Sequence, residues 1–328
     1  MSMRHQSTVP TMLLGTQDNA LALAQAEWVA QRLRGTGIAV RVLAVPCAGD
    51  AVSALRAALV AGEVDVVVHC CQDLPAAADP QVVTAAVPER ADPRDALVAR
   101  DGMVLGELPA GSVLGAGSPR QAAQLRALGL GLRVVPSSGT VQAQIARVAE
   151  GELDGVLIAA AGLIRLGRIG EATELLDPLQ MLPAPGQGAL ACECRVDDLD
   201  TEHLLGELLE DTEVRAAVTA ERALFASVAA ISNAPVGALA DIVEDLDDEG
   251  RVVLRLFLRG VAATVDDDLL RSSATVPYVT TVPYVMGEPT DAEQLGRHVG
   301  AELLDLGAGA LGVNSTLRGP GCGLMGNE

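Results

Sequence analysis

Residues 112–119 read Ser-Val-Leu-Gly-Ala-Gly-Ser-Pro, a short apolar run that ends in a small polar turn. Ser118 is a favoured helix N-cap, and Pro119 suits the first helical position, where its missing N–H costs nothing. The stretch therefore predicts a strand, a turn and a helix in succession. The same order recurs around Gly15–Asn19 and Ser137–Thr140, so the pattern predicts an α/β fold.

Each of these three turns places unpaired backbone N–H groups at the positive end of a helix, which is a natural seat for carboxylates or phosphates. One such turn alone would be an ordinary connection between a strand and a helix. Three of them in two α/β units predict a cleft between two similar domains, with a small-molecule ligand held from both sides.

Composition limits the classes of protein to which the chain can belong. Of 328 residues, 49% are hydrophobic, 20% charged and 2% aromatic, and 43 acids against 23 Lys and Arg give a formal charge of −20. The apolar fraction indicates a globular protein, and the length favours two or three domains. With few cations and few aromatic rings, we expect no nucleic-acid partner and no binding to a membrane surface.

The cysteines and the apolar segments indicate the compartment. Six cysteines, at positions 47, 70, 71, 192, 194 and 322, form no CxxC pair, so we expect reduced thiols and no metal site. The N-terminal residues contain no continuous apolar stretch, and the most apolar run, Gly155–Ile164, is too short to span a bilayer. These observations predict a cytoplasmic protein.

A Pro/Gly-rich run at 182–188, Leu-Pro-Ala-Pro-Gly-Gln-Gly, is too broken for the interior of a helix or strand and predicts a crossover between domains. The chain then divides into three predicted units. Residues 1–88 with 189–206 form α/β domain 1, residues 89–188 form α/β domain 2, and residues 207–328 form a smaller α/β domain 3.

Eight segments spread over most of the chain carry more specific information. They are Val68–Pro75, Ala91–Ala96, Gly115–Arg120, Gly151–Asp154, Ala160–Gly167, Leu182–Ala189, Glu193–Arg195 and Thr219–Ala223. In residue type, order and spacing, these segments resemble the porphobilinogen deaminase (hydroxymethylbilane synthase) family, a family of transferases of tetrapyrrole biosynthesis.

The resemblance implies a fold and an activity. The first two domains are expected to be like type-2 periplasmic binding-protein lobes with a cleft between them, and the third to be a small α/β domain with an open sheet packed against helices. Members of the family condense four porphobilinogen units into a linear tetrapyrrole. The reaction is primed by a dipyrromethane cofactor, which is thioether-linked to a cysteine of domain 3, and a ring of Arg and Lys holds the substrate carboxylates.

The resemblance also implies which residues form the site. Asp73 is the expected catalytic residue, as a general acid/base or as the acceptor of a ligand N–H, although an Asp before Leu-Pro is often a turn former. The expected ligand cleft consists of Thr16, Gln17, Asn19, Cys70, Gln72, Ser118, Arg120, Gln121, Ser138, Gly139, Thr140, Gln144, Arg165 and Gln187.

The chain departs from the family pattern at the positions that carry charge and the cofactor. Ser232 stands where the resemblance places the cofactor cysteine, and a serine hydroxyl is a far weaker nucleophile than a thiol. A lysine-bearing loop expected between Asp50 and Leu55 is missing. Uncharged residues also replace five cations of the family; they are Gln17, Gln72, Gln121, Ser138 and Gln144.

These departures lead to three hypotheses. The first, which we favour on the sequence alone, is a diverged paralogue or pseudoenzyme that carries no dipyrromethane, has lost tetrapyrrole synthesis and binds or transforms a less anionic small molecule. The second is a genuine hydroxymethylbilane synthase with unusual cofactor attachment. The third is a regulatory or structural partner of a true synthase, in a homo- or hetero-oligomer.

Overall fold

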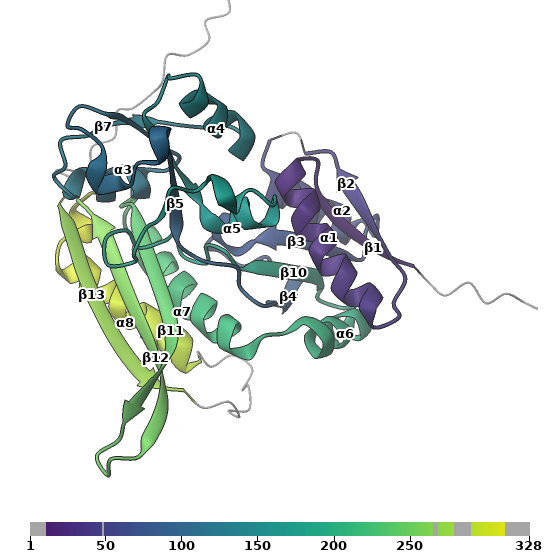
Figure 1. The fold of residues 1–328 in the computed structure, drawn as a ribbon. Coiled ribbons are helices and arrows are strands. Elements are labelled where there is room, and N and C mark those ends of the chain that lie inside the picture. Colours follow the sequence, from purple (N-terminus) through teal and green to yellow (C-terminus); the bar gives the residue numbers. More distant parts are fainter. Residues whose placement is uncertain (1–10, 48, 265–267, 279–289, 312–328) are drawn as a thin grey trace, which may run out of the picture.

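The computed structural model describes residues 11–47, 49–264, 268–278 and 290–311, and Cys322 lies outside them. The described chain forms three sheets, each with its own helices, and Figure 1 shows them as three adjoining bodies. The prediction of a three-domain α/β fold is confirmed. The domain boundaries given above stay a prediction.

The first sheet has the strand order β2-β1-β3-β10-β4. Strand β1 runs parallel to β2 and β3, whereas β10 returns from later in the chain and pairs antiparallel with both β3 and β4. The elements of this domain are β1 (Met12–Gln17), α1 (Ala20–Gly35), β2 (Val40–Val45), α2 (Ala51–Val60), β3 (Val66–Cys70), β4 (Val82–Ala86), β10 (Leu190–Arg195) and α6 (Leu199–Leu209).

The second sheet, ordered β7-β6-β8-β5-β9, has a closely similar plan. Strand β6 is parallel to β7 and β8, and β5 is the antiparallel strand beside β8. Its elements are β5 (Asp95–Ala99), β6 (Val113–Ala116), α3 (Pro119–Ala127), β7 (Arg133–Pro136), α4 (Val141–Ala149), β8 (Gly155–Ala159), α5 (Ala160–Arg165) and β9 (Glu174–Leu175).

The two lobes also share a local device that fixes their central strands. Asp65 accepts a hydrogen bond from the backbone N–H of Leu13 at 2.8 Å, and Asp154 accepts one from Val113 at 2.6 Å. Both aspartates close a Gly-Glu-x-Asp sequence, just before β3 in the first lobe and just before β8 in the second. The lobes are therefore similar in detail as well as in strand order.

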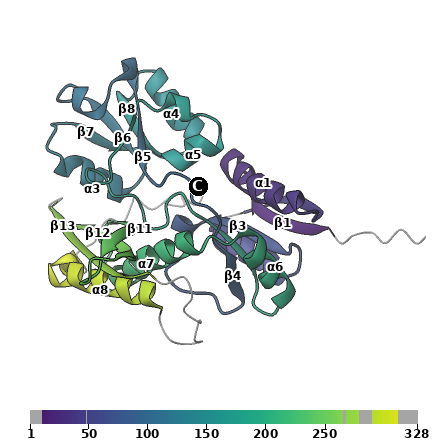
Figure 2. The same ribbon diagram turned by 60° about the horizontal axis from the view of Figure 1, so that its bottom comes forward.

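The third domain is an antiparallel sheet in the order β11-β12-β13, with two helices packed against it (Figures 1 and 2). The helices approach each other closely, because a Cβ at Gly296 would lie 2.2 Å from the carbonyl oxygen of Ala220. Its elements are α7 (Thr212–Ala229), β11 (Val236–Leu246), β12 (Val252–Ala263), β13 (Leu269–Pro277) and α8 (Asp291–Asp305). This arrangement confirms the predicted open sheet packed against helices.

Candidate active site

A cavity of about 850 Å³ lies between domains 1 and 2, where the first turns of several helices meet. Helix α1 of the first lobe and α5 of the second lie beside each other at this boundary (Figure 2). The N-caps of α1, α3 and α4 all line the cavity: Asn19, Ser118 and Thr140 accept hydrogen bonds from backbone N–H groups of their own helices. The wall therefore presents helix N-termini from both lobes, which favours anionic groups.

The structure brings most of the expected cleft residues together around this cavity. Those that line it are Asn19, Gln72, Ser118, Arg120, Gln121, Gly139, Thr140, Gln144 and Gln187. The expected residues that are not part of its lining are Thr16, Gln17, Cys70, Asp73, Ser138 and Arg165. Sequence reasoning missed Arg168, which lines the cavity three residues after Arg165 but is paired with Glu171 at 2.6 Å.

Arg120 is buried, and its charge is used inside the protein. Its guanidinium donates to both carboxylate oxygens of Asp95, at 2.8 and 3.1 Å. It also donates to the backbone oxygen of Leu182 at 2.6 Å and to Gln187 at 3.3 Å. A buried bidentate pair of this kind fixes helix α3 against the crossover segment, so Arg120 contributes structure rather than a free cation.

The glutamines of the cleft also make hydrogen bonds within the protein. Gln121 accepts from the N–H of Gly117 at 2.8 Å and donates to Asp95 at 2.7 Å. Gln144 donates to the carbonyl oxygen of Gly139 at 3.0 Å. These side chains hold the turns that form the cavity wall. An uncharged residue at such a position therefore need not weaken the wall.

Asp73 closes a one-turn 3₁₀ segment, Cys71–Asp73, that follows strand β3. Desolvation raises the pKa of its carboxyl, while a hydrogen bond with Gln72 and the nearby His69 act in the opposite direction. A raised pKa favours the protonated form of the carboxyl, and because the residue is exposed it is accessible to a ligand. The neighbouring Cys70 is a weak acid, because burial raises the pKa of its thiol to about 11.

Arg165 is another cation near this strand end. It donates to the carbonyl oxygen of Gly188 at 2.7 Å, and desolvation lowers the pKa of its guanidinium. Among the described residues no carboxylate lies within ion-pair distance of it. Even so, a guanidinium remains charged at neutral pH, which makes Arg165 available to a carboxylate ligand.

The crossover segment is held by one buried acid, Glu221 on helix α7. Glu221 pairs with Arg90 through two hydrogen bonds of 2.7 and 2.9 Å, and it accepts the backbone N–H groups of Gly186 and Ala240 at 2.6 and 2.9 Å. Gly188 in the same segment has a φ of +86°, and a Cβ there would lie 2.5 Å from the carbonyl oxygen of Ala91. Domain 3 therefore fixes the connection between the two lobes.

Ser232 lies in the loop after α7 and is 5% exposed. Its hydroxyl oxygen accepts a hydrogen bond from the N–H of Ala234 at 3.0 Å. Within the described ranges, no three or more His, Cys, Asp or Glu side chains are grouped to hold a metal ion. The helices in those ranges also include none with the length and apolar character that crossing a membrane requires.

Two similar α/β lobes around a cavity, with a third domain at their crossover, place this chain in the class of two-lobed α/β proteins. A family model described as "Porphobilinogen deaminase, dipyromethane cofactor binding domain" matches residues 12–203. The porphobilinogen deaminase of Nocardia farcinica is 49% identical over 96% of this chain and 92% of its own length. That of Mycobacteroides abscessus is 50% identical over 91% of this chain and 98% of its own length. The chain belongs to the porphobilinogen deaminase family.

Among solved structures, the arginine 3rd transport system periplasmic binding protein of Legionella pneumophila covers 60% of this chain and 91% of its own. The TM-score is 0.36 and the sequence identity 14%.

The comparisons overturn two predictions made from the sequence. The prediction of a repurposed pseudoenzyme that has lost tetrapyrrole synthesis is wrong, because relatives 49% and 50% identical over nearly the whole chain are porphobilinogen deaminases. The prediction that no dipyrromethane is bound is also wrong, because the matched domain is described as binding that cofactor. The physical error was to count each family cation as a ligand contact, whereas Arg120 and Gln121 both bond to Asp95.

Proposed function

We propose that this protein is a porphobilinogen deaminase, a transferase that joins porphobilinogen units into a linear tetrapyrrole in the cavity between domains 1 and 2. The observation that carries the proposal is the identity of 49% to 50% with enzymes of that name over more than nine-tenths of the chain. The cavity of about 850 Å³, bordered by helix N-termini of both lobes, supports it.

The reaction breaks the C–N bond of an aminomethyl group and forms a C–C bond to the free α-carbon of another pyrrole. Ammonia leaves, and the ring whose free α-carbon forms the new bond loses one proton from that carbon. Positive charge develops on the pyrrole when the amine departs, so a carboxylate beside the ring N–H stabilises it. We assign this carboxylate to Asp73, which directly follows Gln72 of the cavity lining.

The substrate carboxylates require positive potential, and the chain supplies it largely without free cations. The first turns of α1, α3 and α4 direct backbone N–H groups toward the cavity. Arg165 adds one guanidinium whose charge no described carboxylate balances. We infer that these groups orient the substrate while Arg120 maintains the wall through Asp95.

The dipyrromethane cofactor of the family, when bound, supplies the first pyrrole rings to which substrate is added. The volume and the N–H donors of the cavity fit a two-ring pyrrole. Ser232 does not fit the thioether, because it has no sulfur and its hydroxyl is nearly buried against Ala234. We therefore assign retention of the cofactor to the cavity and no bond to Ser232.

The test is turnover of porphobilinogen by the purified protein. Turnover is monitored as the loss of the aldehyde-reactive pyrrole and as the porphyrin that forms from the product. We expect Asp73→Asn to lower turnover at least 100-fold, as loss of a general acid/base does. Asp79→Asn is the matched control, since this aspartate lies in the same loop, outside the cavity lining, and its side chain accepts the N–H of Gln81. Equal turnover by the two variants would exclude the role assigned to Asp73.

We also infer that the protein works in the cytoplasm. The described cysteines are all free thiols, and Cys71, Cys192 and Cys194 are buried. Free thiols without disulfides are typical of a reducing compartment. Labelling of the native and unfolded protein with a thiol reagent, after isolation from cells without reductant, would test this inference.

A further inference from the structure

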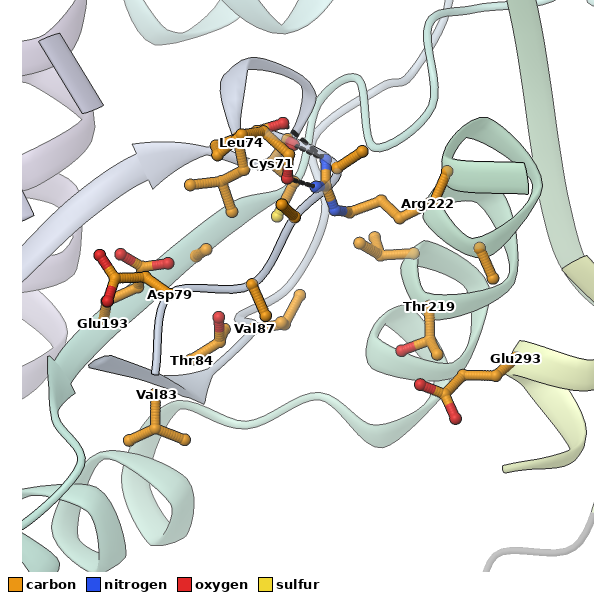
Figure 3. Close-up of a pocket in the computed structure, with 18 of the residues that line it drawn as sticks. Cys71, Leu74, Asp79, Val83, Thr84, Val87, Glu193, Thr219, Arg222 and Glu293 are labelled. Carbon is orange, nitrogen blue, oxygen red and sulfur yellow. Dashed lines mark hydrogen bonds between the residues drawn. The ribbon is translucent and has the colours of Figure 1, made fainter. Parts of the chain in front are cut away.

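Arg222 of helix α7 donates hydrogen bonds to the turn that carries Asp73 (Figure 3), and Val218 of the same helix packs with Cys71 and Leu74 in one hydrophobic cluster. The guanidinium donates from Nη1 to the carbonyl oxygens of Cys71 at 2.8 Å and Leu74 at 3.2 Å. Nη2 donates to the carbonyl oxygen of Pro75 at 2.6 Å. These three carbonyls lie on both sides of Gln72 and Asp73, so Arg222 holds the turn at each end.

No carboxylate pairs with Arg222 in the part of the chain that the structure describes. Desolvation lowers the pKa of its guanidinium, and the like charge of Arg56 acts in the same direction. Arg215 of the same helix, by contrast, is paired with the carboxylate of Glu210. A desolvated cation is stable only when oriented dipoles surround it, and here the turn's carbonyls provide them.

Apart from Arg222, the turn is supported by Cys71 and Leu74, which pack in a buried hydrophobic cluster, whereas Gln72, Asp73 and Pro75 are exposed. Strand β3 ends at Cys70, and the 3₁₀ segment that follows contains only three residues. On the side of domain 1, the N–H of Cys71 donates to the carbonyl oxygen of Ala189 at 3.0 Å. On the opposite side lies a second cavity, of about 790 Å³, lined by Leu74, Pro75 and Arg222 among others (Figure 3). Without Arg222, the carbonyl oxygens of Leu74 and Pro75 would lose the donor that the structure gives them.

The residue before Arg222 holds the connection between the lobes. Glu221 accepts the N–H of Gly186 in the crossover, whereas Arg222 donates to the Asp73 turn. Successive side chains of one helix thus hold both the crossover and the turn with the acid. The orientation of the turn that carries Asp73 therefore depends on how α7 packs against domain 1.

We propose that Arg222 is a positioning residue, which fixes the Cys71–Pro75 turn. Through this contact, the packing of domain 3 against domain 1 determines the orientation of Asp73. The expected effect of an Arg222 substitution on turnover rests on the proposed function. The expected effect on the order of the turn does not depend on that function. Arg222 touches no substrate in this account and acts through the backbone of the turn.

The experiment compares Arg222→Ala with Arg215→Ala. Arg215 is the matched control, because it lies on the same helix and lines the same cavity but bonds to Glu210 and Thr84 instead of the turn. We expect Arg222→Ala to lower kcat at least tenfold with less than a threefold change in KM, and Arg215→Ala to change neither by more than threefold. The Arg222→Lys variant keeps the positive charge but lacks the two Nη groups that bond to separate carbonyls, so we expect an intermediate kcat.

The second cavity allows a rescue experiment that separates positioning from general damage to the fold. Guanidinium at tens of millimolar can enter it and occupy the place of the missing side chain, so we expect a severalfold recovery of kcat in Arg222→Ala and none in Arg215→Ala. Equal kcat in the two alanine variants, or equal response to guanidinium, would overturn the inference.

Amide hydrogen exchange tests the same inference without turnover. We expect peptides that span residues 71–75 to exchange at least tenfold faster in Arg222→Ala than in the wild type, and to be unchanged in Arg215→Ala. If the wild type does not consume porphobilinogen, the proposed function fails while this measurement still decides the inference. Unchanged exchange in Arg222→Ala would overturn it.

Discussion

Replacing Glu221 by glutamine should destabilise the connection between the three domains. The carboxylate is fully buried and accepts two hydrogen bonds from Arg90 and one each from the N–H groups of Gly186 and Ala240. Glutamine has nearly the same shape, but it carries no charge and one of its two heavy atoms becomes a donor. Arg90 would then keep a buried charge without a counter-ion.

The magnitude follows from that uncompensated charge. Removing one partner of a buried ion pair costs about 3–5 kcal/mol. The matched control is Glu213→Gln in the exposed first turn of the same helix, where the carboxylate is worth about 0.3–1 kcal/mol through the helix dipole. We therefore expect the two variants to differ by roughly 2–4 kcal/mol in the free energy of unfolding.

The assay is urea unfolding followed by circular dichroism, with Arg90→Met and the double variant completing a cycle. Because the double variant leaves neither charge unpaired, we expect the two single costs to add up to more than the double cost by at least about 1 kcal/mol. A cost for Glu221→Gln within about 0.5 kcal/mol of the Glu213→Gln cost would refute the reasoning.

Three further predictions concern other parts of the molecule. Gly188→Ala should lower the free energy of unfolding in urea by at least about 2 kcal/mol, because Gly188 has a positive φ and a close backbone contact. Gly167 also has a positive φ but has open space around it, so Gly167→Ala should cost about 1 kcal/mol. Equal costs would contradict this prediction. For Glu193, burial alone would raise the pKa, but hydrogen bonds from Arg56 and His69 lower it to about 2. The contribution of this carboxylate to stability should be complete above about pH 5 and lost as the pH falls toward 2. The free energies of unfolding of the wild type and Glu193→Gln should therefore converge in acid. A difference between them that does not change with pH would contradict this prediction. Ser232→Ala should leave porphobilinogen turnover within threefold of wild type, and a complete loss would show that the hydroxyl carries the cofactor.

Local sequence signals predicted the parts of the fold that depend on neighbouring residues. Ser118 is the N-cap of α3 and Pro119 begins it, as the quoted stretch predicts. The strand, turn and helix predicted around Gly15–Asn19 are β1 at Met12–Gln17, followed by α1 from Ala20. The repeated Gly-Glu-x-Asp sequences that end at Asp65 and Asp154 were a further local signal, which the sequence reasoning did not use.

Long-range partners could not be predicted in the same way. The pairing of Arg120 with Asp95 joins residues 25 positions apart, and that of Glu221 with Arg90 joins residues 131 positions apart. Sequence patterns report whether a residue is charged, but not whether its charge is balanced inside the fold. For that reason Arg120 looked like a ligand cation, and the loss of charge at Gln121 looked like a loss of function.

The most direct test of the central proposal is consumption of porphobilinogen by the wild-type protein, with intact mass measured on the same sample before and after denaturation. The account predicts steady consumption, a tetrapyrrole product, and a mass after denaturation equal to that of the bare chain, since Ser232 has no sulfur for a thioether. The absence of consumption in a folded sample supplied with dipyrromethane would contradict the proposed function.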